Sequence, residues 1–270
     1  MSQRSVITSL TNERVKAIRA LEMRKIRKET GLFVAEGLSL LITARDHGFV
    51  PNTLVYQSGT VESGVGRGLL KFAEQEGSEI LEVSEAVLGK LASKDNPQTM
   101  LGVFPQRFGD APNSENVDPT ATWLALEEVR DPGNLGTILR TADAAGCVGI
   151  IMIGKCCDPF SMEAIRASMG SIFVVPVVKL EHEAFRSLAR RWPGDVVATH
   201  LNATLDFRQA SYRGPELLLM GSEGPGLSDE VLDVCTQRVK IPMSGQLDSL
   251  NLATATALML YQIRAPHLKL

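Results

Sequence analysis

Several familiar signatures of function are absent from this 270-residue sequence. The four cysteines form no Cys-x-x-Cys pair and the four histidines are scattered, so we expect free thiols in a reducing compartment and no metal site. No Gly-x-Gly-x-x-Gly run, Walker phosphate loop or Gly-x-Ser-x-Gly elbow is present. These absences argue against a disulfide scaffold, a zinc protein and an ordinary Rossmann oxidoreductase.

Long apolar runs are absent too. No run approaches the roughly 20 residues that cross a bilayer, and the N-terminus lacks the apolar region of a signal peptide. We therefore expect a cytoplasmic protein with no membrane partner. Apolar residues still make up 44% of the chain, which is enough for a sizeable core.

The net charge of −3 does not mark a nucleic-acid-binding protein, but the charge is unevenly distributed. Residues 1–30 hold eight basic and three acidic side chains, so this segment carries +5. A helix is predicted over 12–29, with apolar residues at helical spacing and a basic opposite face. That face is either a solvated charged surface or a contact for RNA phosphates. The candidate RNA-binding residues are Arg24, Lys25, Arg27 and Lys28.

The pattern of strands and helices predicts two α/β domains. Strands and helices alternate over 1–105, which is typical of a helix-covered sheet. Residues 106–121 are polar, contain two prolines and lack periodicity, so we interpret them as a linker. Alternation resumes over 122–270, and a strand is predicted at 173–177 within a parallel sheet.

Three polar stretches of the second domain follow predicted strands. The first runs from Asn134 to Arg140, the second is a loop over 221–226 with three glycines and Glu223, and the third covers 241–251. Ligands bind at such strand-to-loop exits in open α/β sheets. Taken singly, each has a structural explanation: Asn134 can cap the next helix, Arg140 can pair with Asp143, and Asn251 can cap the last helix.

Together, these stretches resemble the three signature motifs of the SpoU, or TrmH, family of RNA ribose 2′-O-methyltransferases. The matching residues are Asp131-Pro132-Gly133-Asn134-Leu135-Gly136-Thr137-Ile138-Leu139-Arg140-Thr141-Ala142, Met220-Gly221-Ser222-Glu223-Gly224-Pro225-Gly226, Ile241-Pro242-Met243-Ser244-Gly245 and Ser249-Leu250-Asn251. The likeness is detailed over 122–265 and weaker over 1–105, where Arg27, Phe33, Glu36 and Gly37 look like the family's ribosomal-protein-like (L30e-like) substrate-binding domain.

The resemblance implies an α/β fold in which a smaller α/β domain precedes a parallel-sheet methyltransferase domain with a deep trefoil knot. It implies a homodimer that binds S-adenosylmethionine among the knot loops. It favours RNA contact over solvation for the basic N-terminal helix. The expected cofactor contacts are Gly221, Ile241, Leu250, Met243 and Thr199. Gly221 and Gly245 are expected to let the backbone approach the ligand.

The resemblance also implies a catalytic set, which consists of Arg140, Asn134, Glu223, Ser249 and Asn251. Arg140 is expected to come from the partner subunit and to stabilise charge on the ribose 2′-oxygen, because an arginine is a poor base. If Arg140 does act as a base, a nearby phosphate shares the proton. Asn134 is expected to orient Arg140 or the ribose, and Glu223 to hold Arg140 or order its own loop.

The substrate and the activity leave alternatives open. We expect structured RNA, with 23S rRNA ahead of tRNA. One alternative is a non-catalytic RNA-binding or ribosome-assembly protein of the same fold, although such a protein has no need of the full catalytic set. The other is a tRNA methyltransferase that shares the knot but modifies the guanine base. Such an enzyme requires a general base directed at a ring nitrogen.

Overall fold

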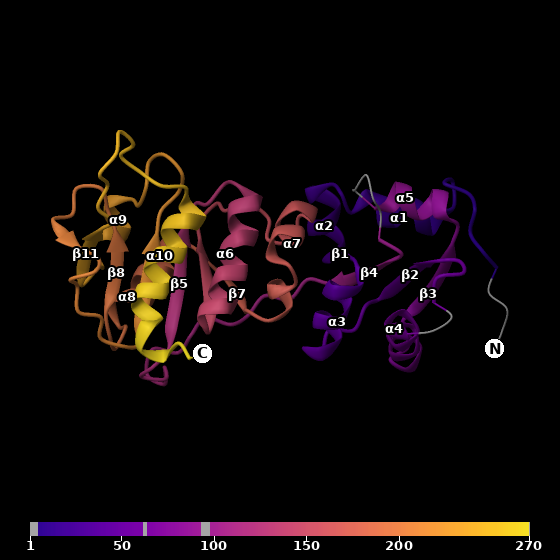
Figure 1. Ribbon diagram of the computed structural model, residues 1–270, viewed down its shortest axis with the longest axis horizontal. Coiled ribbons are helices and arrows are strands. Elements are labelled where there is room, and N and C mark those ends of the chain that lie inside the picture. The colour runs from indigo at the N-terminus through magenta and orange to yellow at the C-terminus, as the bar shows by residue number, and fades with distance from the viewer. Residues whose placement is uncertain (1–4, 62–63, 93–97, 270) are drawn as a thin grey trace. The chain divides into compact units, whose positions relative to one another are not determined.

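The computed structural model describes residues 5–61, 64–92 and 98–269 (Figure 1). It divides into two compact units: unit 1 comprises Met1–Arg107 and Asp158–Val174, and unit 2 comprises Phe108–Cys157 and Val175–Leu270. The sequence-based boundary lies in the 106–121 segment and assigns all later residues to the second domain. In the structure, residues 158–174 pack within unit 1 instead.

Unit 1 is built on a four-stranded mixed sheet of order β1-β4-β2-β3. Strand β4 pairs antiparallel with both β1 and β2, and β2 pairs parallel with β3. Helices α1 and α5 lie on one side of this sheet, and α3 and α4 on the other (Figure 1). The elements are α1 (Glu13–Ala20), α2 (Arg24–Thr30), β1 (Leu32–Glu36), α3 (Leu38–Asp46), β2 (Thr53–Gln57), α4 (Gly64–Gln75), β3 (Glu79–Val83), α5 (Glu85–Leu91), β4 (Met100–Pro105), α7 (Met162–Ser168) and the 3₁₀ turn η1 (Ser171–Phe173).

An aromatic cluster explains why residues 158–174 belong to unit 1. The ring of Phe33 on β1 lies 4.8 Å from that of Phe160 and 5.9 Å from that of Phe173, measured between centroids. Phe104 on β4 lies 5.2 Å from Phe173. Each such ring buries a large apolar area, and aromatic pairs add about 0.5–1.5 kcal/mol beyond that burial. The segment therefore completes the core of unit 1.

Unit 2 is built on a seven-stranded sheet of order β7-β6-β5-β10-β8-β11-β9, in which every pair of neighbouring strands is parallel. Strands this apolar are typical of parallel sheets with both faces covered. The elements are β5 (Thr122–Glu127), α6 (Pro132–Ala145), β6 (Gly149–Ile153), β7 (Val177–Leu180), α8 (His182–Arg190), β8 (Val196–Thr199), β9 (Leu205–Asp206), β10 (Glu216–Met220), α9 (Asp229–Leu232), β11 (Gln237–Lys240), α10 (Leu252–Arg264) and the 3₁₀ turn η2 (Ala265–His267).

The strand residues of unit 2 alternate between two covered faces. Leu217 and Leu219 pack in one core cluster with Phe185 of α8 and Val231 of α9. On the other side of the sheet, α6 and α10 lie side by side (Figure 1), and Arg264 near the end of α10 donates from Nε to the carbonyl of Ala145 at 3.1 Å. This hydrogen bond joins the C-terminal ends of the two helices.

Two predicted elements are wrong. The helix predicted over 12–29 is broken by a turn at 21–23 into α1 and α2. The strand predicted at 173–177 is a 3₁₀ turn followed by a loop, because the ring of Phe173 is drawn into the aromatic cluster, and the strand β7 begins at Val177. The short elements β9 and α9 carry too little periodicity to be predicted.

The α/β class, with a parallel-sheet domain and a smaller α/β domain, is confirmed. The trefoil knot stays a prediction. No helix in the described part of the chain is long and apolar enough to cross a membrane. Within the same residues, no three histidine, cysteine or acidic side chains group as metal ligands do.

Candidate active site

The carboxyl ends of three neighbouring strands define the site in unit 2. Strands β10, β8 and β11 are adjacent and parallel, so their last residues lie along one edge of the sheet. Thr199 at the end of β8 donates from Oγ1 to the sulfur of Met220 at the end of β10, at 3.4 Å. The loops 221–228 and 241–251 leave the sheet at this edge, where ligands bind in open α/β sheets.

The first turn of α6 presents Asn134 to this edge. Asp131, not Asn134, is the N-cap: its Oδ1 accepts a 2.6 Å hydrogen bond from the backbone N–H of Asn134. Pro132 occupies the first helical position, where its missing N–H costs nothing. The sequence-based capping role of Asn134 is therefore wrong, and its side chain is left free to make tertiary contacts.

A chain of side-chain hydrogen bonds joins the three motifs. Asn134 donates from Nδ2 to Oε1 of Glu223 at 2.7 Å, and Asn251 donates from Nδ2 to Oδ1 of Asn134 at 2.9 Å. The second carboxylate oxygen of Glu223 accepts from the backbone N–H of Arg130 at 3.4 Å. Residues up to 117 positions apart in the sequence thus meet in one network.

The groups at the two ends of this network fix the donor and the acceptor of each hydrogen bond in it. The Glu223 carboxylate only accepts, so the amide of Asn134 must turn its NH₂ group toward it and its oxygen toward Asn251. Asn251 must then donate to Asn134, and its own oxygen faces the N-terminus of α10, where it accepts from the N–H groups of Ala253 at 2.9 Å and Thr254 at 3.3 Å. The two amides are therefore ordered by a carboxylate at one end and by helix N–H groups at the other.

Arg140 does not take part in this network. It lies six residues after Asn134 on α6, which is about 9 Å along the axis and about 120° around it. The Arg140 side chain is exposed and makes no hydrogen bond or ion pair with any described residue. Within one chain, Asn134 and Glu223 bind each other and not Arg140, and their expected roles toward an Arg140 of the partner subunit or toward the ribose stay predictions.

Glycine at position 221 is needed for the close packing of its own loop more than for the approach of a ligand. A Cβ atom on Gly221 would lie 2.2 Å from the carbonyl carbon of Gly226 and 2.3 Å from the backbone nitrogen of Leu227. Only glycine lets the loop fold back so closely, and backbone hydrogen bonds between Ser222 and Gly226 close it at 3.2 Å in both directions. Gly245 differs, because a Cβ there would meet nothing within 4 Å.

The remaining predicted residues lie in or beside the 241–251 loop. Ile241 and Met243 are half-buried, and Leu250 is exposed just before Asn251. Ser249 is also exposed and donates from Oγ to Oδ1 of Asp248 at 3.1 Å, so it is outside the Asn134 network. These residues share the edge of the sheet with Gly221 and Thr199, and their roles stay predictions.

Cysteine chemistry takes no part in this site. All four cysteines are free, as expected. Burial, together with the neighbouring Cys156, Glu223 and Asp131, raises the pKa of the Cys157 thiol to about 12. Burial likewise raises the pKa of Cys156 to about 11. Both thiols are therefore protonated at neutral pH, and neither supplies a thiolate nucleophile.

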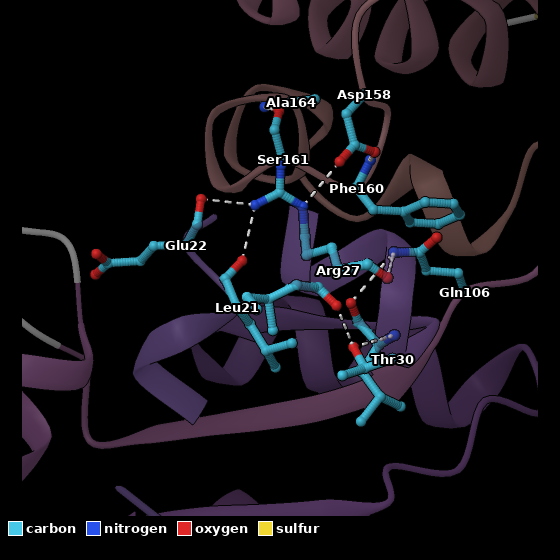
Figure 2. Close-up of polar contacts among 11 residues, drawn as sticks. Leu21, Glu22, Arg27, Thr30, Gln106, Asp158, Phe160, Ser161 and Ala164 are labelled. Atoms are coloured by element: carbon cyan, nitrogen blue, oxygen red, sulfur yellow. Dashed lines mark hydrogen bonds and ion pairs between the residues drawn. The ribbon is translucent and has the colours of Figure 1, made fainter. Parts of the chain in front are cut away.

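The predicted RNA-binding residues lie on α2 of unit 1, and one of them is buried. Arg27 is 3% exposed. Its guanidinium donates from Nε to Oδ2 of Asp158 at 2.8 Å, and from Nη1 to the carbonyls of Leu21 at 2.7 Å and Glu22 at 2.8 Å (Figure 2). The prediction that Arg27 contacts RNA is wrong, because its guanidinium joins the turn after α1 to residue 158. Arg24, Lys25 and Lys28 are exposed.

The fold and the site together define a class of protein: an α/β protein that combines a smaller sheet unit with a parallel-sheet unit, whose polar ligand site lies at the carboxyl ends of the strands. Residues 121–261 match the SpoU rRNA Methylase family. Residues 12–102 match the MRM3-like substrate binding domain. The chain belongs to the SpoU rRNA methylase family, as the three motifs predicted, and is a methyltransferase.

Individual relatives extend the match to nearly the whole chain. A tRNA/rRNA methyltransferase of Synechocystis, described as uncharacterized, is 34% identical over 96% of this chain and 93% of its own. The 23S rRNA (guanosine(2553)-2′-O)-methyltransferase RlmP of Bacillus subtilis is 28% identical over 96% of this chain and 98% of its own. The AdoMet-bound rRNA methyltransferase of Sinorhizobium meliloti is 44% identical, covers 98% of this chain and 99% of its own, and superimposes with a TM-score of 0.90.

The 241–251 loop has the free polar groups that S-adenosylmethionine (AdoMet) requires. From Met243 to Leu250, no backbone N–H or C=O group is hydrogen-bonded to another described residue. Unpaired backbone groups at a strand edge are suited to an adenine ring, whose edge both donates and accepts hydrogen bonds. The open space at Gly245 leaves room for a ligand beside this backbone. The residues present therefore fit the cofactor.

Proposed function

We propose that this protein transfers a methyl group from S-adenosylmethionine to a ribose 2′-oxygen of 23S rRNA, and that it acts as a homodimer in the cytoplasm. The Glu223–Asn134–Asn251 network carries the proposal, because it joins all three motifs at the strand edge. The relatives support the substrate: RlmP methylates 23S rRNA, as does the 23S rRNA (uridine(2479)-2′-O)-methyltransferase of Streptomyces viridochromogenes.

The sulfonium of S-adenosylmethionine supplies an already activated methyl group. The protein must place the 2′-oxygen in line with that methyl and stabilise the charge that develops as its proton leaves. The ordered amides of Asn134 and Asn251 are suited to positioning the ribose, since a carboxylate and helix N–H groups fix their directions. The unpaired backbone groups of 243–250 would hold the cofactor.

Arg140 supplies the positive charge. An arginine guanidinium is positively charged and a poor base, so Arg140 stabilises the developing alkoxide and neighbouring phosphates instead of removing the proton outright. Arg140 takes no part in the Asn134 network of its own chain, which supports a second subunit as the source of the arginine at each site.

Exposed apolar side chains support the homodimer. On and just before α10, Leu247 is 74% exposed, Leu258 41% and Tyr261 47%. Side chains of this size are costly to leave in water next to one another. A second copy that covers this surface would bring its own α6, and hence Arg140, toward the site.

The test is methyl transfer with purified full-length protein. S-adenosylmethionine labelled on the methyl group is incubated with protein-free 23S rRNA or with bulk tRNA, and the products are digested and separated as nucleosides. We expect label in one 2′-O-methyl nucleoside of 23S rRNA. Label only in tRNA contradicts the substrate, a base-methylated nucleoside contradicts the ribose, and no transfer to either RNA contradicts the activity.

A further inference from the structure

Glu127 is a buried carboxylate that the methyl-transfer mechanism does not use. It is the last residue of β5, immediately before the first motif, and is 3% exposed. A charge in this position is costly unless it is fully hydrogen-bonded. Glu127 accepts from the backbone N–H of Ser228 at 2.8 Å, from the hydroxyl of Ser228 at 2.6 Å and from Nε2 of His182 at 3.1 Å. Two of its three partners therefore belong to one residue.

Ser228 ends the loop that carries Glu223. Its hydroxyl caps α9 by accepting from the N–H of Val231 at 3.3 Å, so Ser228 lies where the loop re-enters regular structure. The other end of the loop leaves β10 at Gly221, which packs closely against Gly226 and Leu227. Holding Ser228 therefore fixes the base of the loop, whereas Glu223 lies at its tip.

Residues 127–134, which lead from β5 into the first motif, are thus joined to this loop at two points. At the base, Glu127 binds Ser228; at the tip, Glu223 binds the N–H of Arg130 and the amide of Asn134. Between the two points the backbone passes through Glu128, a non-glycine residue with a φ of 48°. Such a conformation persists only where its surroundings over-determine it.

We propose that Glu127 is a positioning residue for methyl transfer: by holding Ser228 it sets the distance at which Glu223 meets Asn134, and through Asn134 the placement of Asn251. The inference rests on the proposed role of the Glu223 network. The only sequence feature that points to this role of Glu127 is an acidic residue at the end of an apolar strand, Trp123-Leu124-Ala125-Leu126-Glu127.

The test compares Glu127→Ala with a matched control, Glu216→Ala. Glu216 is another buried carboxylate of the same sheet, 6% exposed, and it accepts from Thr122 at 3.0 Å, but it opens β10 at the end away from the site. Both substitutions should lower the melting temperature. Only Glu127→Ala should lower kcat, by about ten- to a hundredfold, as expected for misplaced catalytic groups, while the KM for RNA stays within about twofold because the RNA-binding unit is untouched.

Glu127→Gln provides the rescue. Its amide can still accept from the N–H of Ser228 and can donate to the hydroxyl, so position is retained while charge is lost. We expect at least half of the wild-type kcat. If Glu127→Gln is as inactive as Glu127→Ala, then Glu127 contributes through its negative charge and not by positioning Ser228, and the inference is overturned.

A double-mutant comparison tests whether Glu127 acts through Glu223. If it does, Glu127→Ala should have little further effect on kcat in a Glu223→Ala background, whereas independent effects multiply. Multiplied effects overturn the inference and leave the role of Glu223 standing. If Glu223→Ala alone retains wild-type kcat, the proposed role of Glu223 and this inference both fall. Should Glu127→Ala not fold, Ser228→Ala replaces it, with the same comparison and the same two outcomes.

Discussion

The basic helical region of unit 1 and the motif site of unit 2 were both singled out by polar residues, yet they are built in opposite ways. In unit 1, a run of like charges contains an arginine, Arg27, that is buried and donates three hydrogen bonds to Asp158 and to two backbone carbonyls. In unit 2, polar residues far apart in sequence meet in one directed network. Separated motifs with fixed residue types therefore predict tertiary contact, whereas a charge run does not predict which members face water.

The break between α1 and α2 explains the difference in unit 1. In one continuous helix, Arg27 would lie about 120° around the axis from the buried Val15. The turn at 21–23 changes the phase, so that the Arg27 side chain points inward, where Asp158 and the carbonyls of Leu21 and Glu22 receive it. The buried guanidinium also holds together segments that the sequence places more than 100 residues apart.

Replacing Arg27 by alanine is the largest expected perturbation of stability. Arg27→Ala removes the donor that binds Oδ2 of Asp158 and two backbone carbonyls, and breaking a buried pair in this way costs about 3–5 kcal/mol. Urea unfolding should report that loss of free energy. Lys28→Ala, one position further on the exposed face, is the matched control and should change stability by less than about 0.5 kcal/mol. Equal effects of the two variants would contradict the structural role of Arg27.

Arg140 provides the opposite case to Arg27, because it is an exposed arginine whose proposed role is in the reaction and not in stability. Arg140→Ala should lower kcat by about 10²–10³-fold, the loss typical of removing one group that stabilises developing charge. Stability and the affinity for S-adenosylmethionine, measured by calorimetry, should stay unchanged. Arg208→Ala, an exposed arginine paired with Asp206, is the control and should leave kcat unchanged. Wild-type turnover of Arg140→Ala would exclude it from the mechanism.

Asn251→Asp tests the network without disturbing the helix cap. The aspartate oxygen still accepts from Ala253 and Thr254, so α10 keeps its N-cap. The other oxygen faces Oδ1 of Asn134, where a donor is required, and Glu223 prevents Asn134 from turning over. We expect kcat to fall about tenfold, corresponding to about 1.4 kcal/mol for a lost hydrogen bond in the site. An unchanged kcat, together with an unchanged melting temperature, would show that the network is dispensable.

The smallest expected effect concerns the exposed lysines of α2. If Lys25 and Lys28 contact RNA phosphates, Lys25→Ala and Lys28→Ala should each weaken binding modestly and reduce the slope of log affinity against log salt by about 0.7–0.9. Lys71→Ala is the control, because Lys71 is also exposed but lies on α4, on the other side of the unit 1 sheet. If the slope changes as much for Lys71→Ala, then the number of positive charges, and not their place on α2, determines RNA binding.

The sequence predicted the alternation of strands and helices because apolar periodicity is a local property. Helix α6 shows this property: Leu135, Ile138 and Leu139 recur at helical spacing and are fully buried, and the helix ends at Gly146. The site emerged from the resemblance of three motifs, since no single motif distinguishes a helix cap from a ligand contact. Asp131 illustrates this limit: it caps α6, and that frees Asn134.

Other features could not be predicted because they depend on tertiary packing. The assignment of residues 158–174 to unit 1 rests on contacts of Phe160, Phe173 and Asp158 with residues more than 50 positions away. The roles of Glu127 and Ser228 depend likewise on a contact across 101 positions. Such pairs show no local pattern, so only the folded chain reveals them.

Mixing two inactive variants is the most direct test of the central claim, that each site combines the network of one chain with Arg140 of the other. Arg140→Ala and Asn251→Asp chains, each poorly active alone, are unfolded together, refolded and assayed. In a mixed dimer one site has an intact network and an intact Arg140, so random pairing should restore about a quarter of wild-type activity. If Arg140 serves its own chain, both sites of every mixed dimer stay defective, and the mixture should be no more active than the average of its two components.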